Sequence, residues 1–230
     1  MEEFGYIRRN YEELVGELSE IARRASVPNP LLVSVTKSGS DDELIALVKA
    51  GAKHLGENRP GEVLRRSQLL SSLGLVHCMH EIGTLQRNKV KLIAESAYMI
   101  HSVDSYQLAK DISRHAEKHG RKIPVLLEVN SAKEPQKSGI IPSEVEPLLN
   151  EILSLEGISV SGLMTMGPVT NSEEEIRPYF RLTKKLFDEL HAKYGFGQAP
   201  TLSMGMSDSY TTAIEEGATL VRIGRKLFRK

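Results

Sequence analysis

The feature of this sequence that most constrains its fold is an alternation of short apolar, β-branched runs with amphipathic helical patterns. The alternation begins with an apolar run over 31–37 and continues to the end of the chain. Strands that alternate with helices pair in parallel and are joined by right-handed crossovers. The sequence therefore predicts an α/β fold built on a parallel sheet.

About eight strand–helix units can be counted, and one additional helix precedes them. The predicted strands are 31–37, 54–58, 76–83, 99–104, 124–130, 158–166, 201–205 and 219–224. The predicted helices are 6–24, 43–48, 63–70, 85–96, 106–119, 142–155, 173–194 and 208–216. Eight units in a chain of 230 residues predict a (β/α)8 TIM barrel with an extra N-terminal helix.

An open doubly wound sheet is the rival fold for the same alternation. Such a sheet usually carries a glycine-rich turn after its first strand. Here that turn reads Lys37-Ser38-Gly39-Ser40 and contains no GxGxxG motif. Since no low-complexity linker and no shift of composition interrupts the chain, we expect a single domain over residues 1–230.

Composition and charge exclude several classes of protein. The chain carries 30 Lys and Arg against 30 Asp and Glu, so it lacks the basic surface that binds nucleic acid or an anionic membrane. The single cysteine, Cys78, excludes an intramolecular disulfide, and no cysteine pair or HExxH spacing indicates a metal site. The acidic N-terminus lacks the apolar core of a signal peptide, and no apolar run could span a bilayer, so we expect a cytoplasmic protein. No apolar helical face is left over, so we expect a monomer.

In barrels of this kind the chemistry takes place at the carboxyl ends of the strands, so polar residues there are the candidate site. The candidates are Lys37, Asn58, His80, Ser203, Ser207, Arg222 and Gly224. Asn58 and Ser207 have the alternative role of forming turns or helix caps. His80 has the alternative role of a hydrogen-bonded core histidine.

Lys37 ends the first apolar run, and small and acidic residues follow it at once. A cation at the end of a buried strand is costly unless it has a partner or loses its charge. A lysine that is desolvated on one side can act as a nucleophilic amine. The alternative is that Lys37 caps the strand and reaches water along its flexible stem.

Arg222 lies in the middle of the last apolar run, where strand parity points its side chain the same way as Leu220. On the first strand Lys37 points with Val33 and Val35. If both sets point into the barrel, Lys37 and Arg222 meet at one mouth, because the first and eighth strands are neighbours. Two cations that close require an anionic or electron-rich ligand between them.

The loops after the last two strands, 203–208 and 222–226, offer glycines, hydroxyls and free backbone N–H groups. This position is the frequent phosphate site of the fold. The alternative is that Gly205 and Gly224 only form turns. A lysine amine, a phosphate loop and an arginine beside a ring nitrogen together describe a pocket for pyridoxal 5′-phosphate (PLP).

In that pocket Lys37 would form a Schiff base with the PLP aldehyde. The phosphate would lie on Ser203, Ser207 and the Gly224 N–H, and Arg222 would donate to the pyridine nitrogen. Because a guanidinium does not give up its proton, the ring nitrogen would stay unprotonated and the ring would be a weak electron sink.

Nearly the whole chain resembles the PLP-homeostasis proteins (the YggS/PROSC type, PLPBP). The segments that carry the resemblance are 33–37, 56–58, 80–89, 102–105, 128–130, 137–139, 162–164, 202–207 and 221–224. Among them the His-x-Ile-Gly-x-Leu-Gln-x-Asn-Lys and Ser-Met-Gly-Met-Ser elements are specific. The resemblance implies a barrel similar to the N-terminal domain of alanine racemase, with PLP on Lys37. It also implies a role in vitamin B6 and amino-acid homeostasis without established catalytic turnover, with PLP-dependent apoenzymes as candidate partners.

The chain departs from the family pattern at three places. Ser38, Gly39 and Ser40 follow the lysine, where the family tends to have a second lysine and a proline. Ser209 stands where the family often has an acidic residue, and Arg229 stands where it has a glycine. These departures concern PLP affinity and release more than the identity of the cofactor.

Two other functions compete with a PLP carrier. The first is a PLP-dependent racemase-like enzyme, for which Tyr210 is the only nearby candidate for a second acid/base group, although a helical position there favours solvent exposure. The second is a Schiff-base aldolase or a phosphosugar isomerase that uses no cofactor.

Overall fold

The computed structural model describes residues 4–134, 136–168, 170 and 172–230, so Met1–Glu3 of the expected domain lie outside the described residues. The strands are β1 (Leu31–Val35), β2 (His54–Glu57), β3 (Cys78–Glu81), β4 (Ala97–Val103), β5 (Ile123–Glu128), β6 (Ile158–Met164), β7 (Thr201–Ser203) and β8 (Leu220–Ile223). The α-helices are α1 (Gly5–Ala25), α2 (Asp41–Lys49), α3 (Pro60–Ser72), α4 (Val90–Ile93), α5 (Tyr106–Lys118), α6 (Pro142–Ile152), α7 (Glu173–Tyr194) and α8 (Tyr210–Glu215).

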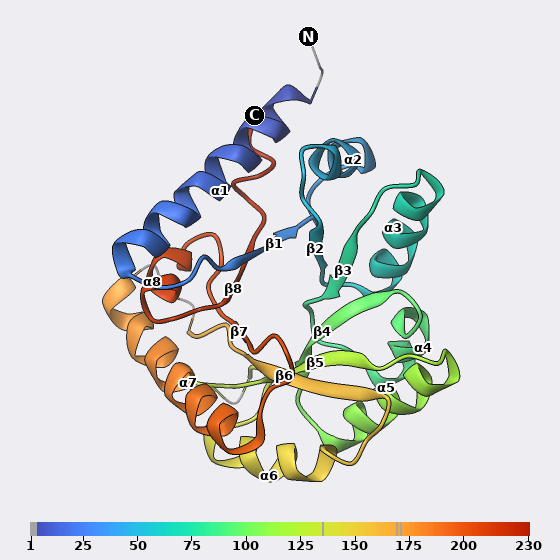
Figure 1. Cartoon of the computed structure of the whole chain (residues 1–230), viewed down its shortest axis with the longest axis vertical. Coiled ribbons are helices and arrows are strands. Elements are labelled where there is room, and N and C mark those ends of the chain that lie inside the picture. The colour runs from blue at the N-terminus through green and yellow to red at the C-terminus, as the bar shows by residue number, and fades with distance from the viewer. Residues whose placement is uncertain (1–3, 135, 169, 171) are drawn as a thin grey trace.

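The eight strands pair in parallel in sequence order and close into a barrel, because β8 pairs with β1. The helices surround this ring of strands, and α1 lies beside α8 on its outside (Figure 1). The predicted (β/α)8 barrel with an extra N-terminal helix is therefore confirmed.

One predicted helix and several strand ends differ from the structure. The predicted helix 85–96 is a 3-10 turn at Arg87–Lys89 followed by the single turn of α4. Its apolar spacing is real, since Leu85, Val90 and Ile93 are all buried, but β4 already begins at Ala97. Strands β1 and β3 are also shorter than predicted, since β1 ends at Val35 and β3 covers only Cys78–Glu81.

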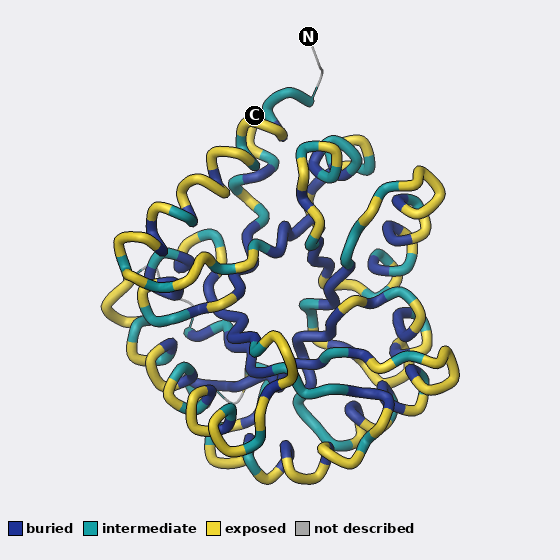
Figure 2. Tube along the Cα trace, in the orientation of Figure 1, coloured by how far each residue is buried: buried dark blue, intermediate teal, exposed yellow. Residues whose placement is uncertain are grey.

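The main core lies between the barrel and its helices. Alternate strand residues such as Leu55, Met79 and Val125 point outward into this layer, where the inner helix faces cover them. Figure 2 shows the pattern as buried strands inside a ring of helices with exposed outer faces. The residues of opposite parity fill the barrel interior, where a second, smaller apolar cluster is built from methionines and Leu126.

Helix α1 packs on the outside of the barrel, beside the C-terminal residues. Its apolar face buries Ile7, Leu14 and Leu18, which recur at helical spacing. The Asn10 amide donates hydrogen bonds to the Leu227 and Arg229 carbonyls, at 3.1 and 2.7 Å. The extra N-terminal helix therefore holds the C-terminal residues in place next to β8.

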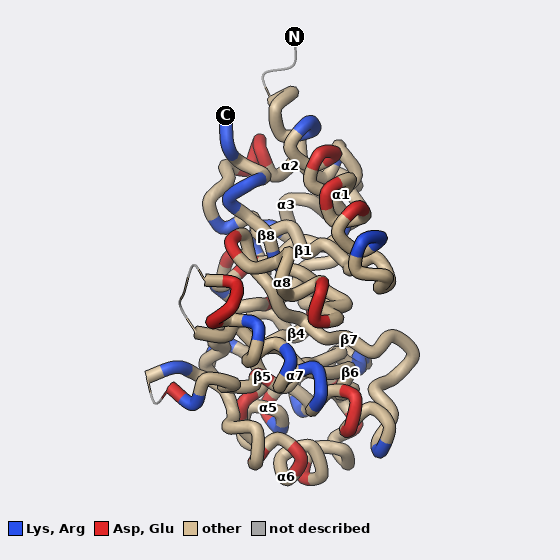
Figure 3. Tube along the Cα trace, turned by 90° about the vertical axis from the view of Figure 1, so that its left-hand side faces the viewer, with Lys and Arg blue, Asp and Glu red and all other residues tan. Residues whose placement is uncertain are grey.

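Basic and acidic residues are interspersed along the helices and the segments that join them (Figure 3). Ion pairs such as Arg23–Glu20 and Lys193–Glu146 are largely exposed and contribute little stability. In the described part of the chain no helix combines the length and the apolar character that crossing a bilayer requires.

We predict that Gly162→Ala on β6 lowers the free energy of unfolding by about 1–3 kcal/mol. A Cβ there would lie 1.9 Å from the Thr201 carbonyl oxygen, and the residue has a φ of +147°. The measurement is urea unfolding followed by circular dichroism. The control is Gly16→Ala within α1, where a Cβ meets nothing within 4 Å, so that it should stabilise the helix by about 0.5–1 kcal/mol. Equal midpoints for Gly162→Ala and the parent would contradict the tight β6–β7 approach.

Candidate functional site

Lys37 lies in the turn after β1, with its side chain exposed at the carboxyl end of the barrel. The prediction that a buried strand desolvates this lysine was wrong. Strand β1 ends at Val35, and Thr36 is the last residue that the barrel buries. The alternative from the sequence, a lysine that reaches water beyond the strand, describes the free protein better.

A buried arginine on α3 fixes the turn that carries Lys37. The Arg66 guanidinium donates to the Thr36 carbonyl at 2.7 Å and to the Gly39 carbonyl at 2.8 Å, so that it holds the backbone on both sides of the lysine. The same guanidinium donates to the buried Glu57 carboxylate at 2.8 Å, and the Thr36 hydroxyl donates to that carboxylate at 2.5 Å. Lys37 is therefore an exposed amine on a firmly held turn.

Arg222 points into the barrel interior and is almost fully buried, with 4% of its surface exposed. It donates to the Ser203 hydroxyl at 2.5 Å, to the Ser203 carbonyl at 3.0 Å and to the Thr165 carbonyl at 3.1 Å. Burial lowers the pKa of Arg222 to about 10, while the negative charge of Glu128 acts in the opposite direction. The guanidinium therefore remains a cation at neutral pH.

Arg222 lies on β8 and Lys37 lies in the turn that follows β1, and these two strands are neighbours, as predicted. Arg222 lies opposite Val33 across the β1–β8 pair, and Lys37 lies four residues further toward the carboxyl end. The two cations therefore lie at different levels of the barrel.

His80 lies in the barrel interior and is fully buried. Both of its ring nitrogens are within hydrogen-bond distance of another imidazole, His54 on one side and His101 on the other, at 2.9 Å each. The structure therefore gives His80 the place of a hydrogen-bonded core histidine, without a free nitrogen at the mouth. The sequence reasoning missed His54 and His101, although strand parity, which also placed Arg222, points both into the barrel.

The two loops beside β7 and β8 lie next to each other at the carboxyl end. The Arg222 N–H donates to the Gly205 carbonyl at 3.1 Å, which ties the loops together. Gly205 has a φ of +92°, and a Cβ on it would lie 2.5 Å from the Ala213 Cβ. Within the described residues, the backbone N–H groups of Ser207 and Gly224 have no hydrogen-bond acceptor. These groups are available to an anion.

The predicted phosphate ligands differ in accessibility. Ser207 and Gly224 are half-buried, so a ligand can reach them from the mouth. The Ser203 hydroxyl is fully buried and already contacts Arg222 and His101, at 2.5 and 3.1 Å. Ser203 thus lies directly beneath the loops and contacts the arginine.

Asn58 is exposed and lines an open cavity together with Lys37, beside the Arg66–Glu57 pair. A Cβ on Gly83 would lie 2.4 Å from the Asn58 carbonyl oxygen, so the loops after β2 and β3 are in close contact. Asn58 is therefore brought to the same side of the mouth as Lys37.

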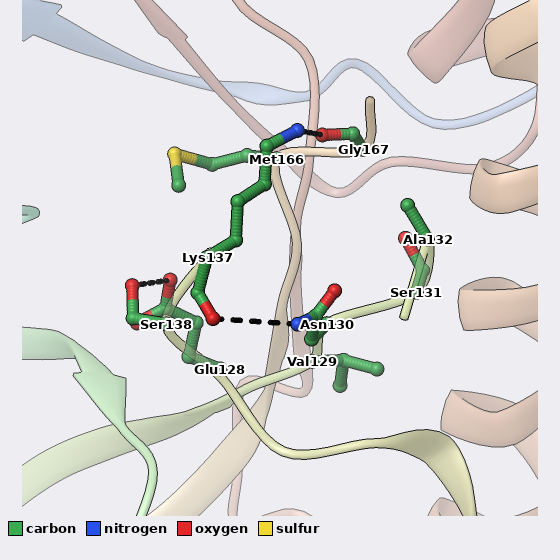
Figure 4. A pocket seen from close by; sticks show the side chains of 9 residues that line it. All are labelled: Glu128, Val129, Asn130, Ser131, Ala132, Lys137, Ser138, Met166 and Gly167. Carbon is green, nitrogen blue, oxygen red and sulfur yellow. Dashed lines mark hydrogen bonds between the residues drawn. The ribbon is translucent and has the colours of Figure 1, made fainter. Parts of the chain in front are cut away.

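A small polar pocket lies across the mouth, where β5 and β6 end (Figure 4). The Asn130 amide bonds to the backbone of Glu134 and Lys137, so Asn130 forms a turn. Glu128 accepts a hydrogen bond from Ser138 at 3.0 Å, and its second carboxylate oxygen is buried without a partner among the described residues. Burial raises the pKa of Glu128 above its ordinary value.

Three of the residues that depart from the family pattern have structural roles. A Cβ on Gly39 would lie 2.4 Å from the Phe228 ring, so the turn after Lys37 packs closely on the C-terminal residues. Ser40 caps α2 through a reciprocal pair of hydrogen bonds with Glu43. Ser209 accepts a hydrogen bond from the Met206 N–H at 3.2 Å within the β7–α8 loop.

Tyr210 does not face solvent, contrary to the expectation from the sequence. It is buried, and its hydroxyl donates to Glu17 of α1 and accepts from Lys226. The residue therefore fastens α8 to α1, on the outside of the barrel. Among the residues that the structure describes, no group of three or more His, Cys, Asp or Glu side chains is arranged to hold a metal ion.

The family model described as "Alanine racemase, N-terminal domain" matches residues 10–229. A pyridoxal phosphate homeostasis protein of Aquifex aeolicus is 41% identical over 197 residues, which cover 86% of this chain and 85% of the relative. The chain belongs to the pyridoxal phosphate homeostasis protein family. A member of this family from Schizosaccharomyces pombe is 32% identical over 213 residues, which cover 91% of this chain and 88% of the relative.

Solved structures agree with membership of the pyridoxal phosphate homeostasis protein family. PipY of Synechococcus elongatus, with PLP bound, is 30% identical, with a TM-score of 0.79 over 91% of this chain and 100% of PipY. The crystal structure of an unknown protein from Bifidobacterium adolescentis is 33% identical, with a TM-score of 0.89 over 97% of this chain and 94% of that chain. Alanine racemase of Corynebacterium glutamicum shares only the fold, with 18% identity and a TM-score of 0.69 over 98% of this chain and 61% of the racemase.

We predict that Arg66→Ala destabilises the protein by about 3–5 kcal/mol, because it leaves the Glu57 carboxylate buried without its cation. Arg66→Met combined with Glu57→Gln removes both charges at similar volume and should cost clearly less. The measurement is the free energy of unfolding in urea for the parent and both variants. An Arg66→Ala protein as stable as the parent would show that the pair does not hold the Lys37 turn.

We predict that Glu81 makes stability fall as pH rises. Burial raises the pKa of Glu81 to about 8, and the charge of Glu57 adds to this effect, while a hydrogen bond from the Gly83 N–H opposes it. Between the ordinary carboxyl pKa of about 4.3 and the raised value, the native state binds more protons than the unfolded state. The parent should therefore lose up to about 1.4 kcal/mol per pH unit relative to Glu81→Gln in this window. Urea titrations at several pH values measure the difference, and a constant difference would contradict the buried proton.

Proposed function

We propose that the chain binds PLP as a Schiff base on Lys37 and acts in PLP (vitamin B6) and amino-acid homeostasis. The observation that carries the proposal is an exposed amine on a rigid turn at the mouth of the barrel, in a family with a PLP-bound member of known structure. PLP-dependent apoenzymes are the candidate recipients of the cofactor. The chain acts in this role as one barrel domain over residues 1–230.

The residues at the mouth fit the parts of PLP. Lys37 offers the amine, and the N–H groups of Ser207 and Gly224, which have no acceptor among the described residues, offer donors to a phosphate. Arg222 offers a buried cation that can donate to the pyridine nitrogen but does not protonate it. PLP supplies an aldehyde that condenses with amines and a ring that withdraws electrons. Asn58, beside Lys37, completes the polar wall of the mouth.

Two features favour a carrier over a racemase. An arginine at the ring nitrogen keeps the ring a weak electron sink, which disfavours carbanion chemistry. Racemisation also needs a second acid/base group on the opposite face of the substrate. Tyr210, the candidate for that role, has its hydroxyl engaged by Glu17 and Lys226.

We predict that Lys37→Ala abolishes the visible absorbance of the Schiff base in PLP-treated protein and leaves the far-ultraviolet circular dichroism unchanged. Because Lys37 is exposed, we expect its side chain to contribute little to the fold. The control is Lys53→Ala, which removes another exposed lysine next to a strand, at the opposite end of the barrel. Borohydride reduction and peptide mapping should place the pyridoxyl group on Lys37, and its recovery on another lysine would refute the assignment.

An assay of alanine racemisation distinguishes the carrier from the racemase-like enzyme. Purified protein loaded with PLP should not interconvert the alanine enantiomers at a rate above that of free PLP. Turnover that disappears in Lys37→Ala would support the racemase-like enzyme instead. A protein without Schiff-base absorbance at any PLP concentration would favour the aldolase or isomerase hypothesis, which needs no cofactor.

A further inference from the structure

The barrel interior contains a continuous chain of hydrogen bonds where TIM barrels usually have branched apolar side chains. His54, at the start of β2, lies 2.9 Å from His80 on β3, and His80 lies 2.9 Å from His101 on β4. His101 continues to the Ser203 hydroxyl at 3.1 Å, and Ser203 contacts Arg222. This chain of hydrogen bonds therefore extends from the amino-terminal end of the barrel to Arg222 at the other end.

Burial favours the neutral form of all three imidazoles. Burial lowers the pKa of His80 to about 3 and lowers the pKa of His101 well below its ordinary value. His54 is half-buried, and burial with the positive charge of Lys53 lowers its pKa as well. A neutral imidazole has one donor and one acceptor nitrogen, so each tautomer in such a chain determines the next one.

Arg222 sets the direction of the chain because a guanidinium only donates. Ser203 accepts from Arg222, so its own proton is free to go to the Nδ1 atom of His101. The Nε2–H of His101 then donates to the Nδ1 atom of His80, and the Nε2–H of His80 donates to the Nδ1 atom of His54. All three histidines are then Nε2–H tautomers.

The reverse direction is unfavourable. His101 would donate to Ser203, which already accepts from Arg222, and the serine proton would have no acceptor among the residues that the structure describes. An unpaired buried donor costs about 1–3 kcal/mol. The positive charge of Arg222 therefore selects the direction in which Ser203 donates to His101.

We propose that His54, His80, His101 and Ser203 form a chain with fixed tautomers that positions the Arg222 guanidinium for its contact with the ring of the cofactor. The histidines are positioning residues, since they act through Ser203 and do not reach the mouth. This role rests on the proposed binding of PLP. The tautomers themselves do not depend on it.

Charged and titratable groups lie next to the hydrogen-bond chain at both of its ends, His54 and Arg222. Lys53 and Tyr98 lie at His54, and the Tyr98 ring contacts the His54 and His80 rings. At the mouth, Glu128 acts on Arg222 through its charge. Burial lowers the pKa of all three imidazoles, which favours the neutral forms that this direction of hydrogen bonding requires.

The first test uses the protein without PLP. Long-range proton–nitrogen NMR spectra of histidine-labelled protein should show His54, His80 and His101 as Nε2–H tautomers at neutral pH. The Arg222 guanidinium protons should be resolved and slow to exchange in the parent, and averaged in His101→Phe. An Nδ1–H tautomer at His101, or unchanged Arg222 signals in the variant, would overturn the proposal.

The second test is a double-mutant cycle on PLP retention, with His101→Phe and Arg222→Ala made singly and together. His101→Phe should weaken PLP retention about tenfold in the parent background and have little effect once Arg222 is gone. His101→Asn, whose amide oxygen can accept from Ser203, should restore part of the loss. His119→Phe, on the exposed end of α5, is the matched control and should change nothing.

The outcomes separate the two proposals. If His101→Phe weakens PLP retention equally in the parent and in Arg222→Ala, the histidine only supports the fold. That result would overturn the positioning role. If the parent binds no PLP, the proposed function fails, whereas the NMR spectra still decide the tautomers and the effect of His101 on Arg222. A His101→Phe protein that does not fold leaves the parent tautomers as the deciding measurement.

Discussion

The buried guanidinium of Arg222 is the interaction on which the interior of this barrel depends. A cation with 4% exposure needs acceptors on every side, and the structure supplies the Ser203 hydroxyl and two backbone carbonyls at the ends of β6 and β7. The hydroxyl in turn needs an acceptor, which His101 provides, and the sequence of neutral imidazoles continues to the other end of the barrel. One charge thus accounts for the polar character of an interior that other barrels fill with branched aliphatic residues.

A second buried arginine, Arg66, organises the polar groups outside the barrel. Arg66 holds the carbonyls of Thr36 and Gly39 and pairs with Glu57, so the chain leaves β1 in a fixed turn. The amine of Lys37 is consequently exposed but its backbone is not free to move. The two arginines therefore act on different parts of the proposed site. Arg66 places the residue proposed to bind the aldehyde, and Arg222 faces the proposed ring.

The candidate site was predictable where a residue's role follows from its own strand. The run around Arg222 showed its inward parity, and the loops of Ser207 and Gly224 followed from their place after β7 and β8. The depth of Lys37 was not predictable, because it depends on Arg66, a residue that lies on a different element and contacts Thr36 from 30 positions away. Tyr210 was misplaced for the same reason: its burial depends on α1, whose Glu17 lies 193 positions away.

The sequence by itself determined the parallel barrel, its leading helix and its resemblance to the PLP-homeostasis proteins, because alternation, parity and short motifs are local properties of the chain. Only the tertiary structure decided that Lys37 is exposed, that His80 has no free nitrogen, and that His54 and His101 join it. Those facts depend on which strands become neighbours and at what register, and a hydrogen bond between residues on different strands exists only once the barrel has closed.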